Sequence, residues 1–511
     1  MEQSKMNAAL YTDRDYIKRC SFCSLFSSLF LILVFVNEYG IETVEKSLIL
    51  AVLICVFNIA VLFSSLAKKL EIHHIAIAVL LIFGLLSLFI QPILNIPDEA
   101  AHLARAELTS RLQLFISPQA TEYTTIQAVQ DLMSNEKVNY LRSTIQGVKI
   151  DQTPALCYHV AASNVFFMYI PQALGIFVAK ILGLDVIWMM WLGRLCNLLV
   201  YTALAGLAIK IIPQWKLPLF FVVCLPMSVQ QAASFSPDAT INALAFLLIA
   251  YYVRLLCASE SSITVKQLGI FTGLAVLLTF SKVTNVFFVA LILTIPKNRF
   301  QKQHLAWGMK GLVILPVVLI GGLYYLYTST FVTNPVHLQY YEAMGVSPSD
   351  QIQFILSSPL TWLNDFVKAC IGMLSDTISS ISSFGWLEYQ YSFLNLVCIF
   401  IFSKLCFQHV KTALNGWGKA LTLLIAIGAY MATCLAMYIT WSPVGSTEIY
   451  GVQGRYLIPA FALLPLLFSS ASKEPLPENP KAQWMERTTL LTVSTSMIGA
   501  MLMLTVAIFY R

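Results

Sequence analysis

Long apolar runs recur along almost the whole chain, and they constrain its fold more than any other feature of the sequence. A transmembrane helix needs roughly 20 consecutive apolar residues, and about thirteen segments approach that length. Hydrophobic residues make up 58% of the chain and charged residues only 11%, whereas soluble proteins carry about 25% charged residues. The sequence therefore predicts an all-α polytopic membrane protein, with spans near 20–37, 47–67, 74–95, 186–209, 217–234, 239–257, 267–281, 283–296, 308–327, 389–408, 418–441, 456–471 and 489–509.

The lysines and arginines between these runs fall in alternate connections. The positive-inside rule places such connections in the cytoplasm. They carry, among others, Lys68 and Lys69, Lys210 and Lys216, Lys297 and Arg299, and Lys404 and Lys411. The opposite connections are then outside the cell: 38–46, 96–185, 235–238, the turn at 282, 328–388 and 442–455.

Two of the outside connections are too long for simple connectors. Residues 161–184 are apolar, but a crossing there would invert the sidedness of all later connections, so we expect an interfacial or re-entrant helix. We expect 328–388, which has an amphipathic stretch around Trp362–Met373, to lie on the membrane surface. The chain then divides into an N-terminal segment with two additional spans (1–72), a membrane core (73–472) with outside loops 96–185 and 328–388, and a cytoplasmic loop with the last span (473–511).

Two adjacent carboxylates, Asp98 and Glu99, follow the third apolar run, where a membrane helix reaches the outer boundary. Pro97 suits the first position of a helix and acids suit its first turn, so helix capping alone could account for them. His102 and Arg105 lie about one turn further along, and they could pair with the acids or face a substrate phosphate. Ionisable clusters at this depth are functional-site hypotheses, so Asp98 or Glu99 is a candidate general base.

Further polar residues fall on the same outer side although they are far apart in the sequence. The candidate residues for binding substrate or phosphate are His102, Arg105, Tyr158, His159, Asp238, Lys282, Gln453, Arg455 and Tyr456. For three of them a purely structural role is also open. Asp238 could do no more than cap its helix, Lys282 could extend its amine to the membrane surface, and Arg455 could anchor its span at the membrane interface. Arg194, Glu388 and Glu448 map to this side too.

Several motifs of soluble and metal-dependent enzymes are absent from the sequence. There is no G-x-x-x-x-G-K-[ST] loop, so ATP-driven transport is not supported. Neither H-E-x-x-H nor G-x-S-x-G occurs. No soluble nucleotide-binding domain follows the spans, so we do not expect a nucleotide-sugar donor on the cytoplasmic side.

Four motifs together resemble the DUF2142 family of bacterial membrane proteins. They are Pro97-Asp-Glu-Ala-Ala-His102, Ser236-Pro-Asp238, Ser281-Lys282 and Val452-Gln-Gly-Arg-Tyr456. The resemblance covers roughly residues 75 to 470, and the first and last motifs are the most specific. That family is similar to the GT-C superfamily of integral-membrane glycosyltransferases, which implies a GT-C-like fold with interfacial helices in the long outside loops.

The resemblance also implies a mechanism. GT-C enzymes transfer a sugar from a polyprenyl-phosphate carrier on the outer face, with inversion, and their catalytic acid follows a core membrane helix. Asp98 occupies that position here, with Glu99 beside it, while Arg455, Lys282 and Arg105 would stabilise the leaving phosphate. The lipid would lie in a groove between the spans and 161–184. Some members use a divalent metal ion, for which Asp98, Glu99 and His102 are the candidate ligands.

We therefore expect a glycosyltransferase in the bacterial cytoplasmic (inner) membrane with its active face outside. Its partners would be a polyprenyl-phosphate sugar donor, a cell-surface polysaccharide or other glycan acceptor, and the lipid bilayer, with no nucleic acid. The alternatives are a transporter or flippase of lipid-linked glycan, and a non-catalytic or ligase-type protein of the same architecture. Related sequences often have Pro-Pro-x-x-Tyr late in the first loop, but here Tyr158 follows a single proline, which leaves its role open.

Overall fold

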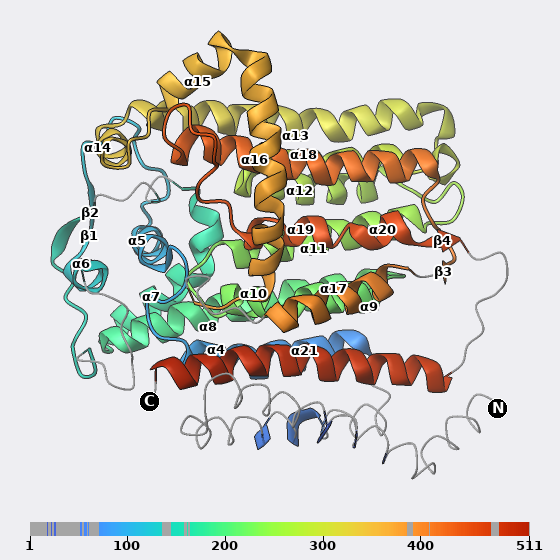
Figure 1. The fold of residues 1–511 in the computed structure, drawn as a ribbon, viewed down its shortest axis with the longest axis horizontal. Coiled ribbons are helices and arrows are strands. Elements are labelled where there is room, and N and C mark those ends of the chain that lie inside the picture. The colour runs from blue at the N-terminus through green and yellow to red at the C-terminus, as the bar shows by residue number, and fades with distance from the viewer. Residues whose placement is uncertain are drawn as a thin grey trace.

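The computed structural model describes residues 71–134, 145–157, 161, 164–385, 392–407, 409–471 and 480–509, together with isolated residues between 18 and 60. The described part is mostly helical, which confirms the predicted class. Six of its helices are long and apolar enough to cross a membrane. They are α4 (Ile72–Ile90), α8 (Val186–Ile211), α11 (Asp238–Leu256), α13 (Ala306–Ser329), α18 (Gly416–Trp441) and α21 (Pro480–Phe509), and they run side by side (Figure 1). The count of about thirteen spans stays a prediction, since the first two lie mostly outside the described residues.

Helix α11 is the centre of the bundle, and α13 lies at its edge. The apolar stretch of α11 is 94% buried, whereas that of α13 is only 22% buried. Helix α11 packs on α8, on α10 (Pro226–Ala232) and on α12 (Val265–Ser281). Helix α13 exposes Leu312, Leu319 and Leu323, as a lipid-facing helix does.

Prolines divide two of the predicted spans into shorter helices. The segment 217–234 ends as α9 (Lys216–Val223) and restarts at Pro226 as α10. The segment 456–471 forms η9 (Gly454–Tyr456), α19 (Ile458–Phe461) and α20 (Leu464–Phe468). The reason is that proline has no backbone N–H to donate and its ring excludes the preceding turn. The predicted span 283–296 also differs, because it forms a 3-10 helix, η4 (Val283–Thr294).

The first long outside connection has its own small fold. It contains α5 (Glu99–Ser110), β1 (Tyr123–Ile126), α6 (Gln127–Ser134), β2 (Pro154–Cys157), η3 (Phe166–Tyr169) and α7 (Ile170–Ile181). The strands are antiparallel, with Tyr123 opposite Cys157. Helix α7 has 12 residues, which gives a length of roughly 18 Å, too short to cross the hydrocarbon core of about 30 Å. It turns at Gly183, where φ is +59°, and packs along α8.

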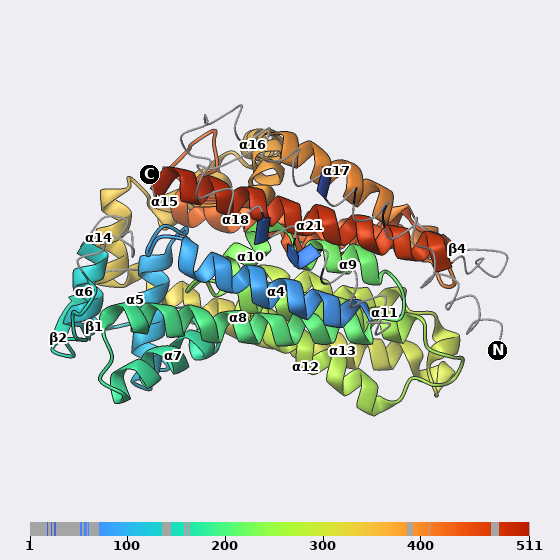
Figure 2. The same cartoon turned by 90° about the horizontal axis from the view of Figure 1, so that it is seen from below.

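The second long outside connection contains η7 (Thr330–Thr333), α14 (Pro335–Ala343), α15 (Pro348–Ser357), α16 (Pro359–Ser379) and η8 (Ser380–Ser382). Helix α16 runs across the long helices in Figure 1 and is seen end-on in Figure 2. It exposes Leu360 and Ile371, in keeping with the amphipathic pattern of this stretch. The Asn334 amide donates to the carbonyls of Pro118 and Ala120, so the two outside connections contact each other.

The opposite end of the bundle carries the short connections. They include η5 (Lys297–Arg299), η6 (Gln303–Leu305) and a parallel pair of two-residue strands, β3 (His409–Val410) and β4 (Ser470–Ala471). Helix α17 (Ser392–Cys406) leads to this end and packs on α9 and α20. The predicted basic residues of 297–310 lie in this region, away from the loops that carry Asp98.

Candidate functional site

Asp98 lies in a tight connection between α4 and α5. Two residues of this connection have left-handed backbone angles, Leu94 with φ 63° and Asp98 with φ 62°. Such angles are uncommon outside glycine, and aspartate tolerates them better than leucine does. Asp98 is the N-cap residue of α5, and its side chain remains 35% exposed while its carboxylate contacts Arg455. The connection therefore presents one partly accessible carboxylate at the C-terminal end of α4.

Arg455 joins acids from two distant parts of the sequence. It lies in η9, and its side chain is only 2% exposed. Its Nη2 contacts Asp98, and its Nε lies 2.9 Å from Oδ2 of Asp238. Nη1 donates to the Pro97 carbonyl at 3.0 Å, and Nη2 also donates to the Tyr456 hydroxyl at 3.2 Å. The guanidinium therefore fixes the positions of both carboxylates.

Asp238 is held by the turn that starts α11. The sequence Ser236-Pro237-Asp238 places the proline just before the helix. The Asp238 backbone N–H donates to the Ser236 hydroxyl at 3.2 Å. Asp238 is thus both a first-turn acid, as capping predicts, and an ion-pair partner of Arg455.

Lys282 supplies a second cation at the same place. It lies in the turn between α12 and η4, with its Nζ 3.4 Å from the centre of the Tyr456 ring. Such cation–π contacts are strongest where water is excluded. Burial lowers the pKa of Lys282 to about 8; the charge of Asp238 opposes this decrease and that of Arg455 adds to it. Asp98, Asp238, Lys282, Arg455 and Tyr456 form what we call the Arg455 cluster.

Glu99 differs from its neighbour Asp98, because it is fully buried and its oxygens are already occupied. Arg194 donates to it twice, from Nε at 2.9 Å and from Nη2 at 2.6 Å. The backbone N–H of Leu94 donates at 2.9 Å and that of Phe235 at 3.3 Å. Glu99 therefore has a structural role, because its carboxylate binds Arg194 and two backbone N–H groups.

Arg105 and His102 face a different part of the first loop. Arg105 is fully buried and donates to the carbonyls of Asn164, Gln113 and Leu114 at 2.6, 3.1 and 2.7 Å. The Nδ1 atom of His102 lies 3.0 Å from the Tyr169 hydroxyl. The structure thus places Arg105 on backbone oxygens of the loop, where a guanidinium stabilises loop conformation rather than contacting the Arg455 cluster.

The remaining predicted residues have simpler outcomes. Gln453 precedes η9, and its buried side-chain oxygen accepts no hydrogen bond from the described residues. Tyr456 contributes its hydroxyl to Arg455 and its ring to Lys282. Tyr158 and His159 lie outside the described residues, as does Glu388.

The predicted metal ligands do not fit a metal ion. Within the described ranges no three His, Cys, Asp or Glu side chains come close enough to hold one. Both oxygens of Glu99 accept hydrogen bonds, and the carboxylate of Asp98 contacts Arg455. A divalent ion there would have to displace a guanidinium from each acid.

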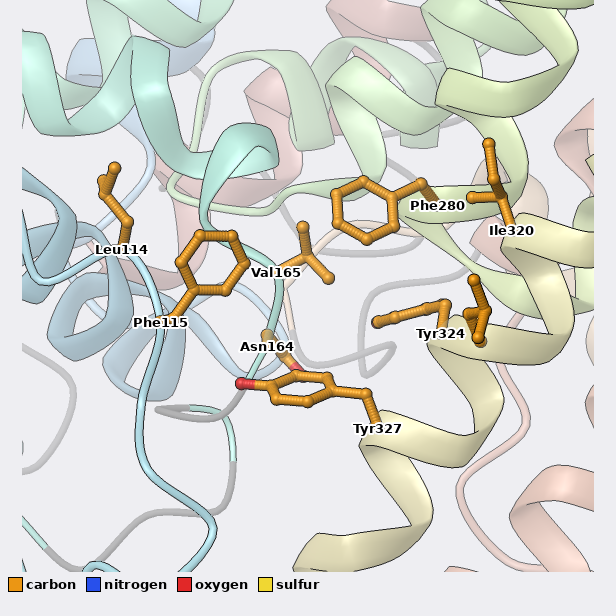
Figure 3. A pocket seen from close by; sticks show the side chains of 9 residues that line it. Leu114, Phe115, Asn164, Val165, Phe280, Ile320, Tyr324 and Tyr327 are labelled. Atoms are coloured by element: carbon orange, nitrogen blue, oxygen red, sulfur yellow. The ribbon is translucent and has the colours of Figure 1, made fainter.

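An apolar groove of about 290 Å³ opens beside the cluster. It is lined by Leu114, Phe115, Asn164, Val165, Phe280, Ile320, Leu323, Tyr324 and Tyr327. In Figure 3, Leu114 and Phe115 are toward one end, Phe280, Tyr324 and Ile320 are toward the other, and Val165 is between them. Phe280 precedes Lys282 by two residues, so the last turn of α12 connects this end of the groove with the buried amine. Arg105 holds the carbonyls of Leu114 and Asn164, which fixes the opposite wall.

Arg194 is the important residue to which the sequence assigned no role. It lies within α8, in the apolar run Trp191-Leu-Gly-Arg-Leu195, and is fully buried. A charge inside an apolar run signals a buried partner, but the partner could not be read from spacing, because Glu99 is 95 residues away.

Comparison with known proteins gives a family. Residues 81–464, well over half of the 511-residue chain, match the family described as predicted membrane protein (DUF2142). No curated protein and no solved structure matches the chain. All four residues that the motifs single out, Asp98, Asp238, Lys282 and Arg455, lie inside the matched range. The chain therefore belongs to the DUF2142 family of predicted membrane proteins, as its motifs indicate.

Proposed function

We propose that this protein is a glycosyltransferase that moves a sugar from a polyprenyl-phosphate carrier to a cell-surface glycan, on the outer face of a bacterial inner membrane. The observation that carries the proposal is the Arg455 cluster beside the apolar groove. A phosphate on a long apolar chain requires cations next to an apolar surface. Lys282 and Arg455 are such cations, and Phe280, Val165 and Ile320 line such a surface.

Asp98 is the general base of the proposed reaction. Its side chain is partly exposed, whereas Glu99 is enclosed and already accepts four hydrogen bonds. Asp98 removes the proton from an acceptor hydroxyl, whose oxygen attacks the anomeric carbon. The bond between that carbon and the phosphate oxygen breaks on the opposite side, so the configuration inverts and polyprenyl phosphate leaves.

The charges of the cluster suit this chemistry. Before reaction, two cations (Lys282 and Arg455) face two carboxylates (Asp98 and Asp238). When Asp98 takes the proton, the cluster gains one positive charge as the leaving phosphate gains a negative one. Cations already fixed in a water-poor site stabilise such a developing charge more than they would in water.

The groove is the proposed place for the part of the isoprenoid chain nearest the phosphate. Its walls come from the first loop and from α13, a helix that faces lipid, so a chain can enter from the bilayer. The rings of Phe167 and Phe280 stack at 5.5 Å, and Tyr324 meets Phe280 edge-on at 5.2 Å. Flat rings and branched apolar chains pack well together.

The test is the composition of the surface glycan, by mass spectrometry, in cells that carry Asp98→Asn or Arg455→Ala at normal protein level. We expect loss of one sugar substituent while the polymer backbone stays and the lipid-linked donor accumulates. A matched control is Asp365→Asn, which neutralises an exposed acid of α16 paired only loosely with Lys368 at 3.7 Å, and which should leave the glycan unchanged.

Two results would contradict the proposal. If the glycan is unchanged in both variants, the cluster has no role in transfer. If the polymer itself disappears from the surface while its lipid-linked form accumulates inside, the protein moves the lipid-linked glycan across the membrane instead of transferring a sugar.

A further inference from the structure

We propose that Arg194 and Glu99 are a pair of positioning residues that sets the spacing of Asp98 and Asp238, and thereby aims Arg455 and Lys282 at the substrate phosphate. This inference rests on the proposed function and adds residues to it that touch no substrate. The pair lies directly behind the cluster. It contacts the backbone of both segments that carry the two acids.

Arg194 also donates hydrogen bonds to the end of α4. Besides its two hydrogen bonds to Glu99, its Nη1 donates to the carbonyls of Leu88 and Gln91 at 3.1 and 2.9 Å. Its Nη2 donates to the Pro92 carbonyl at 3.1 Å. The last carbonyls of a helix have no partner within the helix, so Arg194 both caps α4 and fixes the direction in which the chain leaves it.

Glu99 connects the segment that leads to Asp98 with the segment that leads to Asp238. Its Oε2 accepts the N–H of Leu94, in the connection that leads to Asp98. Its Oε1 accepts the N–H of Phe235, in the turn that leads to Asp238. One carboxylate thus joins the two backbone segments, which are 136 residues apart at the Phe235 contact.

The backbone of the first segment needs such support. Leu94 and Asp98 both have φ near +60°, and leucine in this region is strained. Strained angles persist where surrounding contacts determine the conformation, and they cluster at functional sites. Glu99 bonds directly to the N–H of Leu94, so removing its charge would allow that segment to relax.

The arrangement is more specific than a stabilising ion pair. A fully buried ion pair is weak evidence for stability, because apolar residues of similar size often replace one without loss. Here the hydrogen bonds named above end on the other member of the pair or on backbone that precedes Asp98 or Asp238. Because Arg455 contacts both acids, a change in their separation changes the position of its guanidinium.

The test uses the full-length protein in nanodiscs and farnesyl phosphate, an isoprenyl monophosphate, as the probe. Its affinity is measured by calorimetry from about pH 6 to about pH 10, where a lysine of lowered pKa titrates. Binding to the wild-type protein should weaken as pH rises through about 8, as Lys282 loses its proton. Asp238 favours the protonated amine, so a displacement of Asp238 away from Lys282 should move this midpoint to lower pH.

The variants are Glu99→Gln, Arg194→Lys and a matched control, Glu107→Gln, a fully buried carboxylate further along α5 that contacts neither acid. For Glu99→Gln we expect affinity at neutral pH to fall about 10-fold and the midpoint to decrease by at least about half a pH unit. Arg194→Lys, which keeps the buried positive charge but cannot make all the hydrogen bonds of the guanidinium, should shift the midpoint in the same direction. The control should keep the wild-type midpoint, even with a lower unfolding temperature.

The outcomes separate the two proposals. The positioning inference fails if all four proteins bind farnesyl phosphate with the same pH midpoint: the wild type, the control, Glu99→Gln and Arg194→Lys. The pair then only stabilises the fold, while the proposed function stands. If the wild-type protein does not bind farnesyl phosphate at any pH, the proposed function fails and the inference fails with it.

Discussion

The two ends of α5 carry buried charge clusters that differ in how much of a carboxylate each leaves accessible to a ligand. At the N-terminal end, Arg455 joins Asp98 and Asp238, and Lys282 forms no ion pair with any described residue. At the C-terminal end, Glu107 accepts from Lys180 at 2.6 Å and from Thr125 at 2.9 Å, and Arg111 lies 2.7 Å away. We call Glu107, Arg111, Thr125 and Lys180 the Glu107 cluster.

The difference teaches how to distinguish a ligand site from a structural ion pair. In the Glu107 cluster the carboxylate is fully buried and each oxygen has at least two partners, so no group remains for a ligand. In the Arg455 cluster one acid is 35% exposed, and one amine lies on an aromatic ring without an ion-pair partner among the described residues. Burial of charge is common to both clusters, and only in the Arg455 cluster is a carboxylate side chain partly exposed.

The largest expected effect comes from Arg455→Lys, which keeps the charge but removes the planar fork. A lysine cannot contact Asp98, Asp238 and the Pro97 carbonyl together, so we expect sugar transfer to fall by about 100-fold or more. The measurement is the fraction of glycan repeats that carry the sugar, at matched protein level. Transfer within a few-fold of wild type would mean that the two clusters do not differ in function.

The next effect concerns pH and Lys282. Because its pKa is about 8, the amine is charged below that pH and neutral above it, so transfer should fall as pH rises through about 8. Lys282→Met should lose about 10- to 100-fold at neutral pH, and Lys282→Arg should retain transfer above pH 9, since arginine stays charged. The pH–rate profile of purified protein checks this. A profile that is the same for lysine and arginine would remove Lys282 from the phosphate site.

A smaller effect is expected from Gly454→Ala, which alters the support of Arg455 without touching its side chain. A Cβ at this position would lie 2.5 Å from the Thr377 carbonyl of α16 and would also meet the Ser380 hydroxyl. The clash should cost about 1–3 kcal/mol of stability and reduce transfer by about 10-fold. Thermal unfolding measures the loss of stability, and glycan analysis measures the loss of transfer. Gly269→Ala, where nothing lies within 4 Å, is the control.

The smallest effect on transfer should come from Lys180→Met, in the Glu107 cluster. It removes one of two cations from a buried carboxylate, so stability should fall by about 1–3 kcal/mol. Transfer per folded molecule should stay within about two-fold of wild type, because the cluster contacts no group of the Arg455 site. A loss as large as that of Arg455→Lys, without unfolding, would show that both ends of α5 serve the reaction.

Much of the candidate site could be predicted from ionisable residues in apolar surroundings. Asp98, Asp238, Lys282 and Arg455 each lie where an apolar run meets an outside connection, and alternation of basic loops assigns them to one side. The structure brings these four together although they come from four separate connections. Sidedness therefore carries information about proximity that residue spacing alone does not.

The sequence could not distinguish Asp98 from Glu99, because that difference depends on a left-handed residue and on a distant arginine. It also could not show that Arg105 would bind backbone carbonyls, since any cation near an outer face is a plausible phosphate ligand. The helix breaks at Pro226 and Pro459 follow from the chemistry of proline. They are missed when spans are identified from apolar content, which proline does not interrupt.

The left-handed backbone of Asp98 has an evolutionary consequence. Only glycine, asparagine and aspartate adopt this conformation readily, so few substitutions at position 98 preserve the turn. Asparagine and glycine do so without supplying a carboxylate, and each can arise from an aspartate codon by a single nucleotide change. A chain with asparagine or glycine at position 98 would therefore keep the turn while it loses the carboxylate that the proposed reaction needs.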